Sequence, residues 1–91
     1  MNEQDEKPSG SRSPKYKKHD VVTVMTEISV QIECCTRVWI GLGEGRVIIL
    51  KDAIKGLSTY YIYEEGYFTF HDHRGGSQTI HIEEITEIGG Y

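Results

Sequence analysis

Two glycine-containing turns divide residues 59–83 into three short runs rich in aromatic and β-branched side chains. The first turn, residues 64–66 (EEG), places glycine third in a three-residue loop. That position needs a left-handed backbone and closes a hairpin with a bulge. The second turn, residues 74–76 (RGG), has the same form. The sequence therefore predicts a three-stranded antiparallel meander.

The two turns agree on which side chains of the meander point inward. Counting from the first turn pairs Tyr63 with Tyr67, and counting from the second pairs His73 with Ser77. Side chains alternate between the two faces of a strand, so a slip of one residue in either hairpin would break the agreement. The predicted inward set is Tyr60, Ile62, Phe68, Phe70, Ile80 and Ile82.

The opposite face of the meander gathers tyrosines and histidines. It is predicted to carry Tyr61, Tyr63, Tyr67, Thr69, His71, Thr79, His81 and Glu83. Exposed aromatic side chains grouped on one face are typical of a binding surface, or of a face that a partner or another part of the chain covers. We therefore expect partner binding at Tyr61, Tyr63, Tyr67, Thr69, His71 and His81.

Residues 20–34 alternate between apolar and polar side chains. The even positions read Val22, Val24, Thr26, Ile28, Val30, Ile32 and Cys34. This period of two predicts one long bent strand or two strands joined at a bulge, and a turn at residues 25–27 is the alternative. Residues 52–58 form either a loop or one turn of helix, and no other segment is expected to be helical.

The next strands are predicted over residues 37–42 and 46–51, joined by a tight hairpin at residues 43–45 (GEG). These glycines do not indicate a phosphate loop, because strand-forming residues follow them rather than a helix. The run Val47, Ile48, Ile49 and Leu50 is apolar on both faces, so either it is central in the sheet or its outer side contacts another subunit. With Trp39, which faces away from Val38 and Ile40, it is the candidate oligomer interface.

Near the end of the chain, the alternation slips between Ile82 and Ile85, as a 3₁₀ turn at residues 83–84 would make it do. Small barrels of the SH3-like and Sm-like type turn their last corner this way, an analogy of general architecture rather than of motif. The sequence therefore predicts an all-β fold, a small, strongly bent antiparallel sheet or partly open barrel of five to seven strands.

Charge and apolar content divide the chain into a tail, residues 1–18, and a single domain, residues 19–91. The tail is polar and punctuated by Pro and Gly, so we expect it to be disordered. Residues 1–19 hold five Lys/Arg against three Asp/Glu, whereas residues 20–91 hold five against eleven, a net charge of −6. An acidic body repels phosphate backbones, so a protein partner with a basic or neutral surface is favoured over nucleic acid.

The two cysteines, Cys34 and Cys35, are adjacent and cannot form the framework of a secreted disulfide-rich domain. The N-terminus lacks the apolar segment of a signal peptide, and the longest aliphatic run is too short to cross a bilayer. We therefore expect a cytoplasmic protein that does not contact membranes. By parity, Cys34 is expected to point inward and Cys35 outward.

The histidines are the remaining candidates for chemistry. His71 and His73 precede a turn and His81 lies diagonally across the strand pair, so a zinc site is an alternative to plain polar histidines. Zinc needs three or four ligands, and nothing in the sequence fixes the distance of Cys34 or Cys35 from these histidines, so neither a metal nor a cofactor is predicted. Catalysis needs a nucleophile with a base within hydrogen-bonding reach, and no such pair is evident. An enzyme is therefore not expected.

These observations favour a non-enzymatic protein-interaction module of the adaptor or inhibitor type, binding through the exposed tyrosine and histidine face and self-associating through the apolar run. The alternative is a single-stranded RNA- or DNA-binding barrel in which aromatics stack on bases while Arg46, Arg74 and the basic tail hold phosphates. The net charge of −6 in residues 20–91 opposes this alternative.

Overall fold

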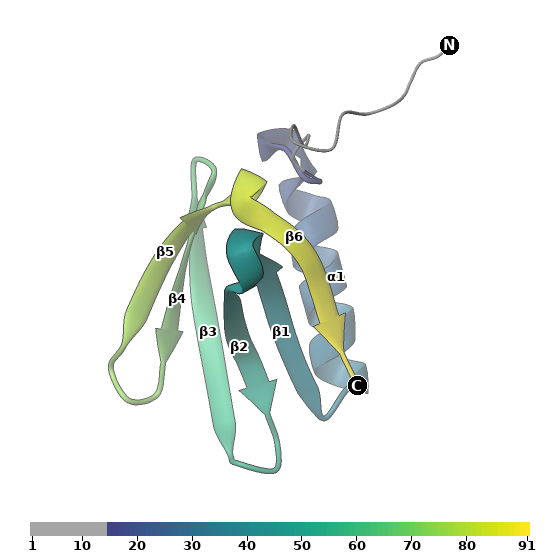
Figure 1. Ribbon diagram of the computed structural model, residues 1–91, viewed down its shortest axis with the longest axis vertical. Coiled ribbons are helices and arrows are strands. Elements are labelled where there is room, and N and C mark those ends of the chain that lie inside the picture. Colours follow the sequence, from purple (N-terminus) through teal and green to yellow (C-terminus); the bar gives the residue numbers. More distant parts are fainter. Residues whose placement is uncertain (1–14) are drawn as a thin grey trace.

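The computed structural model describes residues 15–91, which form one helix and six antiparallel strands in a single open sheet (Figure 1). The helix is α1 (Val21–Cys34), and the strands are β1 (Arg37–Leu42), β2 (Val47–Asp52), β3 (Leu57–Glu64), β4 (Tyr67–Asp72), β5 (Ser77–His81) and β6 (Ile85–Gly90). Three short 3₁₀ turns are η2 (Lys18–Asp20), η3 (Gly43–Gly45) and η4 (Ile82–Glu84). The strand order is β5-β4-β3-β2-β1-β6, so β5 and β6 are the edges. The prediction of a fold made mostly of antiparallel sheet is confirmed, and the sheet is open.

Residues 21–34 are a helix, and the prediction of a strand over residues 20–34 is wrong. The same segment also carries apolar side chains at helical spacing, at Val21, Val24, Met25, Ile28 and Ile32. Val24 and Ile28 are fully buried, whereas Val22 and Val30, which the alternation placed inside, are exposed. Valine and isoleucine lower helix propensity by only about 0.5 kcal/mol per residue, so the packing of an apolar stripe decides between the two periods.

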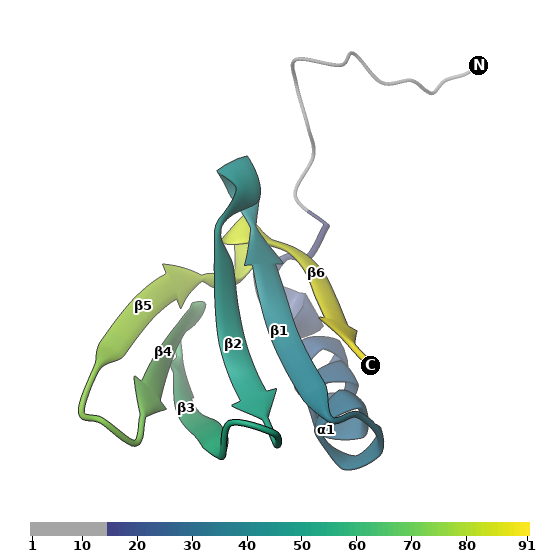
Figure 2. The same cartoon turned by 60° about the horizontal axis from the view of Figure 1, so that its bottom comes forward.

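Polar contacts hold both ends of α1, which runs along β1 and β6 (Figure 2). Ahead of the helix, the Asp20 carboxylate accepts a hydrogen bond of 2.9 Å from the backbone N–H of Lys17. At the other end, the Lys51 ammonium on β2 donates a hydrogen bond of 2.7 Å to the carbonyl of Ile32. A cation at a helix C-terminus satisfies a carbonyl that has no partner within the helix. A hydrogen bond from β2 therefore anchors the C-terminal end of the helix.

Tyr16 packs into the hydrophobic core although the sequence placed it in the tail. Its side chain is 5 % exposed, and its hydroxyl donates a hydrogen bond of 2.6 Å to the Glu27 carboxylate of α1. Burial, followed by this hydrogen bond and the charge of Glu27, raises the pKa of Tyr16 to about 12. The packed part of the chain therefore begins ahead of residue 19. The rest of the predicted tail, residues 1–14, lies outside the described residues.

The expected turns at η3 and η4 are both present. In η3, Glu44 and Gly45 have φ of 65° and 76°, which closes the predicted hairpin between β1 and β2. At η4, the backbone N–H of His81 donates a hydrogen bond of 2.8 Å to the Glu84 carboxylate. This hydrogen bond, together with the nearby Arg46, lowers the pKa of Glu84. This 3₁₀ turn carries the chain from edge strand β5 to edge strand β6.

Candidate functional site: the outer meander face and a groove beside β2

The β3–β4 hairpin has a two-residue turn rather than the predicted three-residue loop. Its central residues, Glu65 and Gly66, both have positive φ, 49° and 96°, as a type I′ turn requires. The register therefore pairs Glu64 with Tyr67 and Tyr63 with Phe68. The prediction that Tyr63 pairs with Tyr67 is wrong by one residue, because Glu65 adopts a left-handed conformation that is uncommon outside glycine.

This register shift of one residue reverses which side chains of β3 face the core. Tyr61 and Tyr63 point to the core side, with ring centroids 5.3 Å and 4.8 Å from that of Phe68. Burial raises the pKa of Tyr61. Tyr60 and Ile62, predicted to be inside, are 64 % and 56 % exposed. The assignment of Tyr61 and Tyr63 to the exposed face is therefore corrected.

The β4–β5 hairpin differs from its predicted register by two residues, and the faces are unchanged. Phe68 pairs with Ile80 rather than with Ile82, and both Phe68 and Ile80 are buried. An even shift preserves the side to which each residue points. The left-handed glycine of the turn is Gly75, with φ of 89°, rather than Gly76.

The Asp72 carboxylate holds this second turn together. Its Oδ1 accepts hydrogen bonds of 2.9 Å from the backbone N–H of Gly76 and 2.8 Å from that of Arg74. These two bonds favour the ionised carboxylate and lower the pKa of Asp72. The carboxylate is therefore committed to the backbone of its own turn.

The resulting exposed surface is called here the outer meander face. It consists of Tyr60, Ile62, Tyr67, Thr69, His71 and His81. Tyr60 stacks on His71 with centroids 5.0 Å apart and planes 23° apart, while the ring of Tyr67 meets that of His81 edge-on at 4.8 Å. The hydroxyls of Thr69 and Thr79 hydrogen bond at 2.9 Å. Ordered contacts therefore link the exposed rings in pairs.

Four of the six predicted binding residues, Tyr67, Thr69, His71 and His81, share this outer meander face, and Tyr60 and Ile62 replace the other two. The sequence signal that would have found these two is the pair Glu65-Gly66. An acidic residue before glycine between two strands resembles the Asp-Gly signature of a two-residue hairpin turn, although Glu lacks the short side chain that favours the left-handed region.

The histidines and cysteines do not converge. His71 pairs with Ser77 and His81 with Tyr67, so the two imidazoles lie toward opposite ends of β4. Over residues 15–91, no three His, Cys, Asp or Glu side chains are grouped closely enough to hold a metal ion. Because residues 21–34 are helical, Cys34 is exposed and Cys35 is half-buried, the reverse of the predicted orientation.

The candidate oligomer interface is divided by the fold. Ile48 and Leu50 are buried in the core of the chain itself, so these two are withdrawn as residues that contact another subunit. Val47 is exposed and Ile49 is half-buried on the other side of β2. Trp39 points away from the core, as predicted. Its indole N–H donates a hydrogen bond of 2.8 Å to the Glu87 carboxylate on β6.

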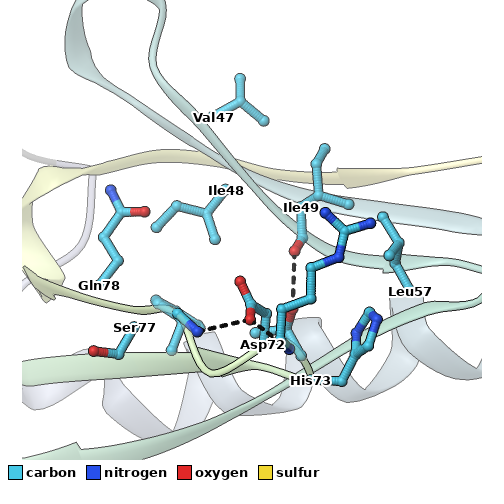
Figure 3. Close-up of a pocket in the computed structure, with 12 residues that line it drawn as sticks. Val47, Ile48, Ile49, Leu57, Asp72, His73, Ser77 and Gln78 are labelled. Atoms are coloured by element: carbon cyan, nitrogen blue, oxygen red, sulfur yellow. Dashed lines mark hydrogen bonds between the residues drawn. The ribbon is translucent and has the colours of Figure 1, made fainter.

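A groove of about 360 Å³ opens beside β2 (Figure 3). One wall is the apolar strand, with Val47, Ile48 and Ile49, and the other is the β4–β5 turn with the start of β5. The lining residues are Val47, Ile48, Ile49, Leu57, Thr59, Phe70, Asp72, His73, Arg74, Gly76, Ser77 and Gln78. The groove and the outer meander face share no residue.

No protein-family model, curated protein or solved structure matches this chain. The one helix of residues 15–91 is neither long nor apolar enough to span a membrane. Inference about function therefore rests on the outer meander face and the groove alone.

Proposed function

We propose that this chain is a non-enzymatic protein-interaction module whose outer meander face binds a basic or neutral surface of a partner protein. The observation that carries the proposal is the grouping of Tyr60, Ile62 and Tyr67, each more than half exposed, on one side of the two adjacent strands β3 and β4. A large apolar side chain exposed alone needs no explanation, whereas a contiguous group marks an interaction surface.

Aromatic stacking prepares this face for binding. Tyrosine is enriched among the residues that dominate interface energetics, because it buries a large area and has few rotatable bonds. His71 holds the ring of Tyr60 and His81 contacts that of Tyr67. Restricting a side chain before association reduces the entropy cost of binding, about 0.5–1.5 kcal/mol per immobilised side chain.

The charge around the face indicates the kind of partner. Residues 57–84 contain five Asp/Glu and a single cation, Arg74. Two of the acidic residues, Glu64 and Glu65, lie at the β3–β4 turn beside Tyr67. Since like charges facing each other across an interface are costly, an acidic partner is disfavoured and a basic or neutral one is favoured.

Stacking of Tyr60 on His71 also favours the second candidate function, binding of single-stranded nucleic acid, since such flat exposed rings accept bases. The outer meander face, however, contains no Lys or Arg to pair with phosphates. A titration with single-stranded DNA in a salt series tests this candidate. Binding that weakens steeply as salt rises would support it, and no binding at low salt would remove it.

The double variant Tyr60→Ser/Tyr67→Ser is expected to lose partner binding while remaining folded. The immobilised chain is used to capture a partner from lysate, the partner is identified by mass, and its Kd is measured by calorimetry with both proteins purified. Loss of two interface tyrosines is expected to weaken binding by about 100-fold or more. The melting temperature should change by only a few degrees, because both side chains are exposed.

Ile54→Ser is the matched control, because Ile54 is 86 % exposed in the turn between β2 and β3 and lies outside the outer meander face. This control should retain the affinity of the unsubstituted chain. Equal affinities of the Tyr60→Ser/Tyr67→Ser variant and the unsubstituted chain would contradict the proposal.

A further inference from the structure

We propose that the groove between β2 and the β4–β5 turn binds a small aliphatic carboxylate. This ligand site goes beyond the proposed protein-interaction function, because the groove shares no residue with the outer meander face.

The groove arises because β2 and β3 pair over only part of their length. Their register is limited to Lys51 with Ser58 and Asp52 with Leu57. One step farther, the hydroxyl of Thr59 donates a hydrogen bond of 3.2 Å to the carbonyl of Ile49, so a side chain spans the gap in place of the backbone. The opening is thus fixed by a hydrogen bond and is present before any ligand binds.

The lining of the groove has the character of a small-molecule site. Val47, Ile49, Leu57 and Phe70 contribute apolar surface, and the polar side chains come mainly from the β4–β5 turn and the start of β5. Small-ligand sites are typically concave spaces of about 300–1,000 Å³ that combine apolar walls with a few polar groups. A volume of about 360 Å³ suits a short aliphatic chain with one polar head.

The turn carries one negative side chain, Asp72, and one positive side chain, Arg74, and these differ in whether their polar atoms are already engaged. Asp72 uses its carboxylate on the backbone N–H groups of Gly76 and Arg74. Arg74 makes no ion pair with any carboxylate of residues 15–91. Its guanidinium presents paired N–H donors that match the two oxygens of a carboxylate. The unpaired cation beside an apolar wall therefore selects an anionic head attached to an aliphatic chain.

The experiment is a ¹H–¹⁵N NMR titration of the full chain with hexanoate, alongside 1-hexanol and hexylamine at the same concentrations. Hexanoate is expected to shift the amide signals of Val47, Ile49 and Gln78 and to bind at least about tenfold more tightly than hexanol. This ratio is what loss of a hydrogen bond to a charged group is expected to cost. Hexylamine should bind most weakly.

Two variants assign the binding to the groove. Arg74→Gln should weaken hexanoate binding about tenfold and abolish its advantage over hexanol, whereas Arg46→Gln, which removes the same charge outside the groove lining, should leave hexanoate binding unchanged. Val47→Glu, at a half-exposed position of the wall, should abolish hexanoate binding by repulsion. The proposal would be overturned if hexanol and hexanoate bound equally well, or if Arg74→Gln bound hexanoate as tightly as the unsubstituted chain. It would also be overturned if hexanoate shifted no amide signal of the groove residues. A negative result in this titration would not bear on the proposed protein-interaction function, which the Tyr60→Ser/Tyr67→Ser variant tests separately.

Discussion

Phe68→Ala is expected to lower the free energy of unfolding by about 3–5 kcal/mol, the range for a buried aromatic residue changed to alanine. Phe68 is 0 % exposed, and its ring contacts those of Tyr61, Tyr63 and Phe70. A core of this size rarely supplies more than about 3–5 kcal/mol in total, so the variant should be largely unfolded. Urea denaturation followed by circular dichroism should show an unfolding transition for the unsubstituted chain and little or none for the variant.

Ile62→Ala is the control for Phe68→Ala. Ile62 belongs to the same meander but is 56 % exposed, so its removal should change the free energy of unfolding by less than about 0.5 kcal/mol. A loss in Ile62→Ala as large as that in Phe68→Ala would mean that β3 buries the opposite face from the one described.

Tyr16→Ala is the second large expected effect, again about 3–5 kcal/mol of unfolding free energy. Its ring is nearly completely buried, and its hydroxyl is bonded to Glu27 on α1. Tyr16→Phe keeps the ring and loses only the hydrogen bond, so it should cost about 1 kcal/mol. Urea denaturation of both variants would separate ring packing from the hydrogen bond. A neutral Tyr16→Ala would show that the segment before α1 does not contribute to the core.

The pH dependence of unfolding gives an independent readout for Tyr16. Its pKa is raised from 10.0 to about 12, so the folded state favours the neutral phenol. The corresponding stability is present in full below about pH 10 and is lost as the pH rises toward 12. Tyr16→Phe should remove this part of the alkaline destabilisation. An alkaline profile identical to that of the unsubstituted chain would contradict the account.

The sequence was sufficient where a local turn signal and the alternation of side chains agreed. Strand β1, the hairpin at η3 and the 3₁₀ turn at η4 follow from glycine placement and the slip between Ile82 and Ile85. Phe68 and Phe70 were correctly expected in the core. In each case the determining residues are close together in the chain, so no distant contact is needed to choose the conformation.

Helix α1 was beyond this reasoning because residues 21–34 satisfy two periods. Alternation and helical spacing both place Val24 and Ile28 inside, and they differ mainly at Val22 and Val30. The helix is selected by packing against β1 and β6. Strand β6 is distant from the helix in sequence, so this contact cannot be seen in the local pattern. Two residues of the candidate oligomer run, Ile48 and Leu50, were misplaced for a related reason, since their burial depends on neighbouring strands.

The exposed face was predicted in type but only partly in residues. Its β4 and β5 members were correct because a register shift of two preserves the faces, whereas its β3 members were wrong because a shift of one reverses them. That difference depends on Glu65 accepting a positive φ of 49°, which the local sequence does not favour. The groove had no sequence signature, since it results from the limited pairing of β2 with β3.

The two-residue turn between β3 and β4 places Tyr60 and Ile62 outside and Tyr61 and Tyr63 inside, and the proposed binding face depends on this arrangement. Cross-strand backbone nuclear Overhauser effects in the folded protein test it directly. The structure predicts that Tyr63 is paired with Phe68 and Tyr61 with Phe70. Cross-strand contacts pairing Tyr63 with Tyr67 and Ile62 with Phe68 would contradict this arrangement and would return Tyr61 and Tyr63 to the exposed face.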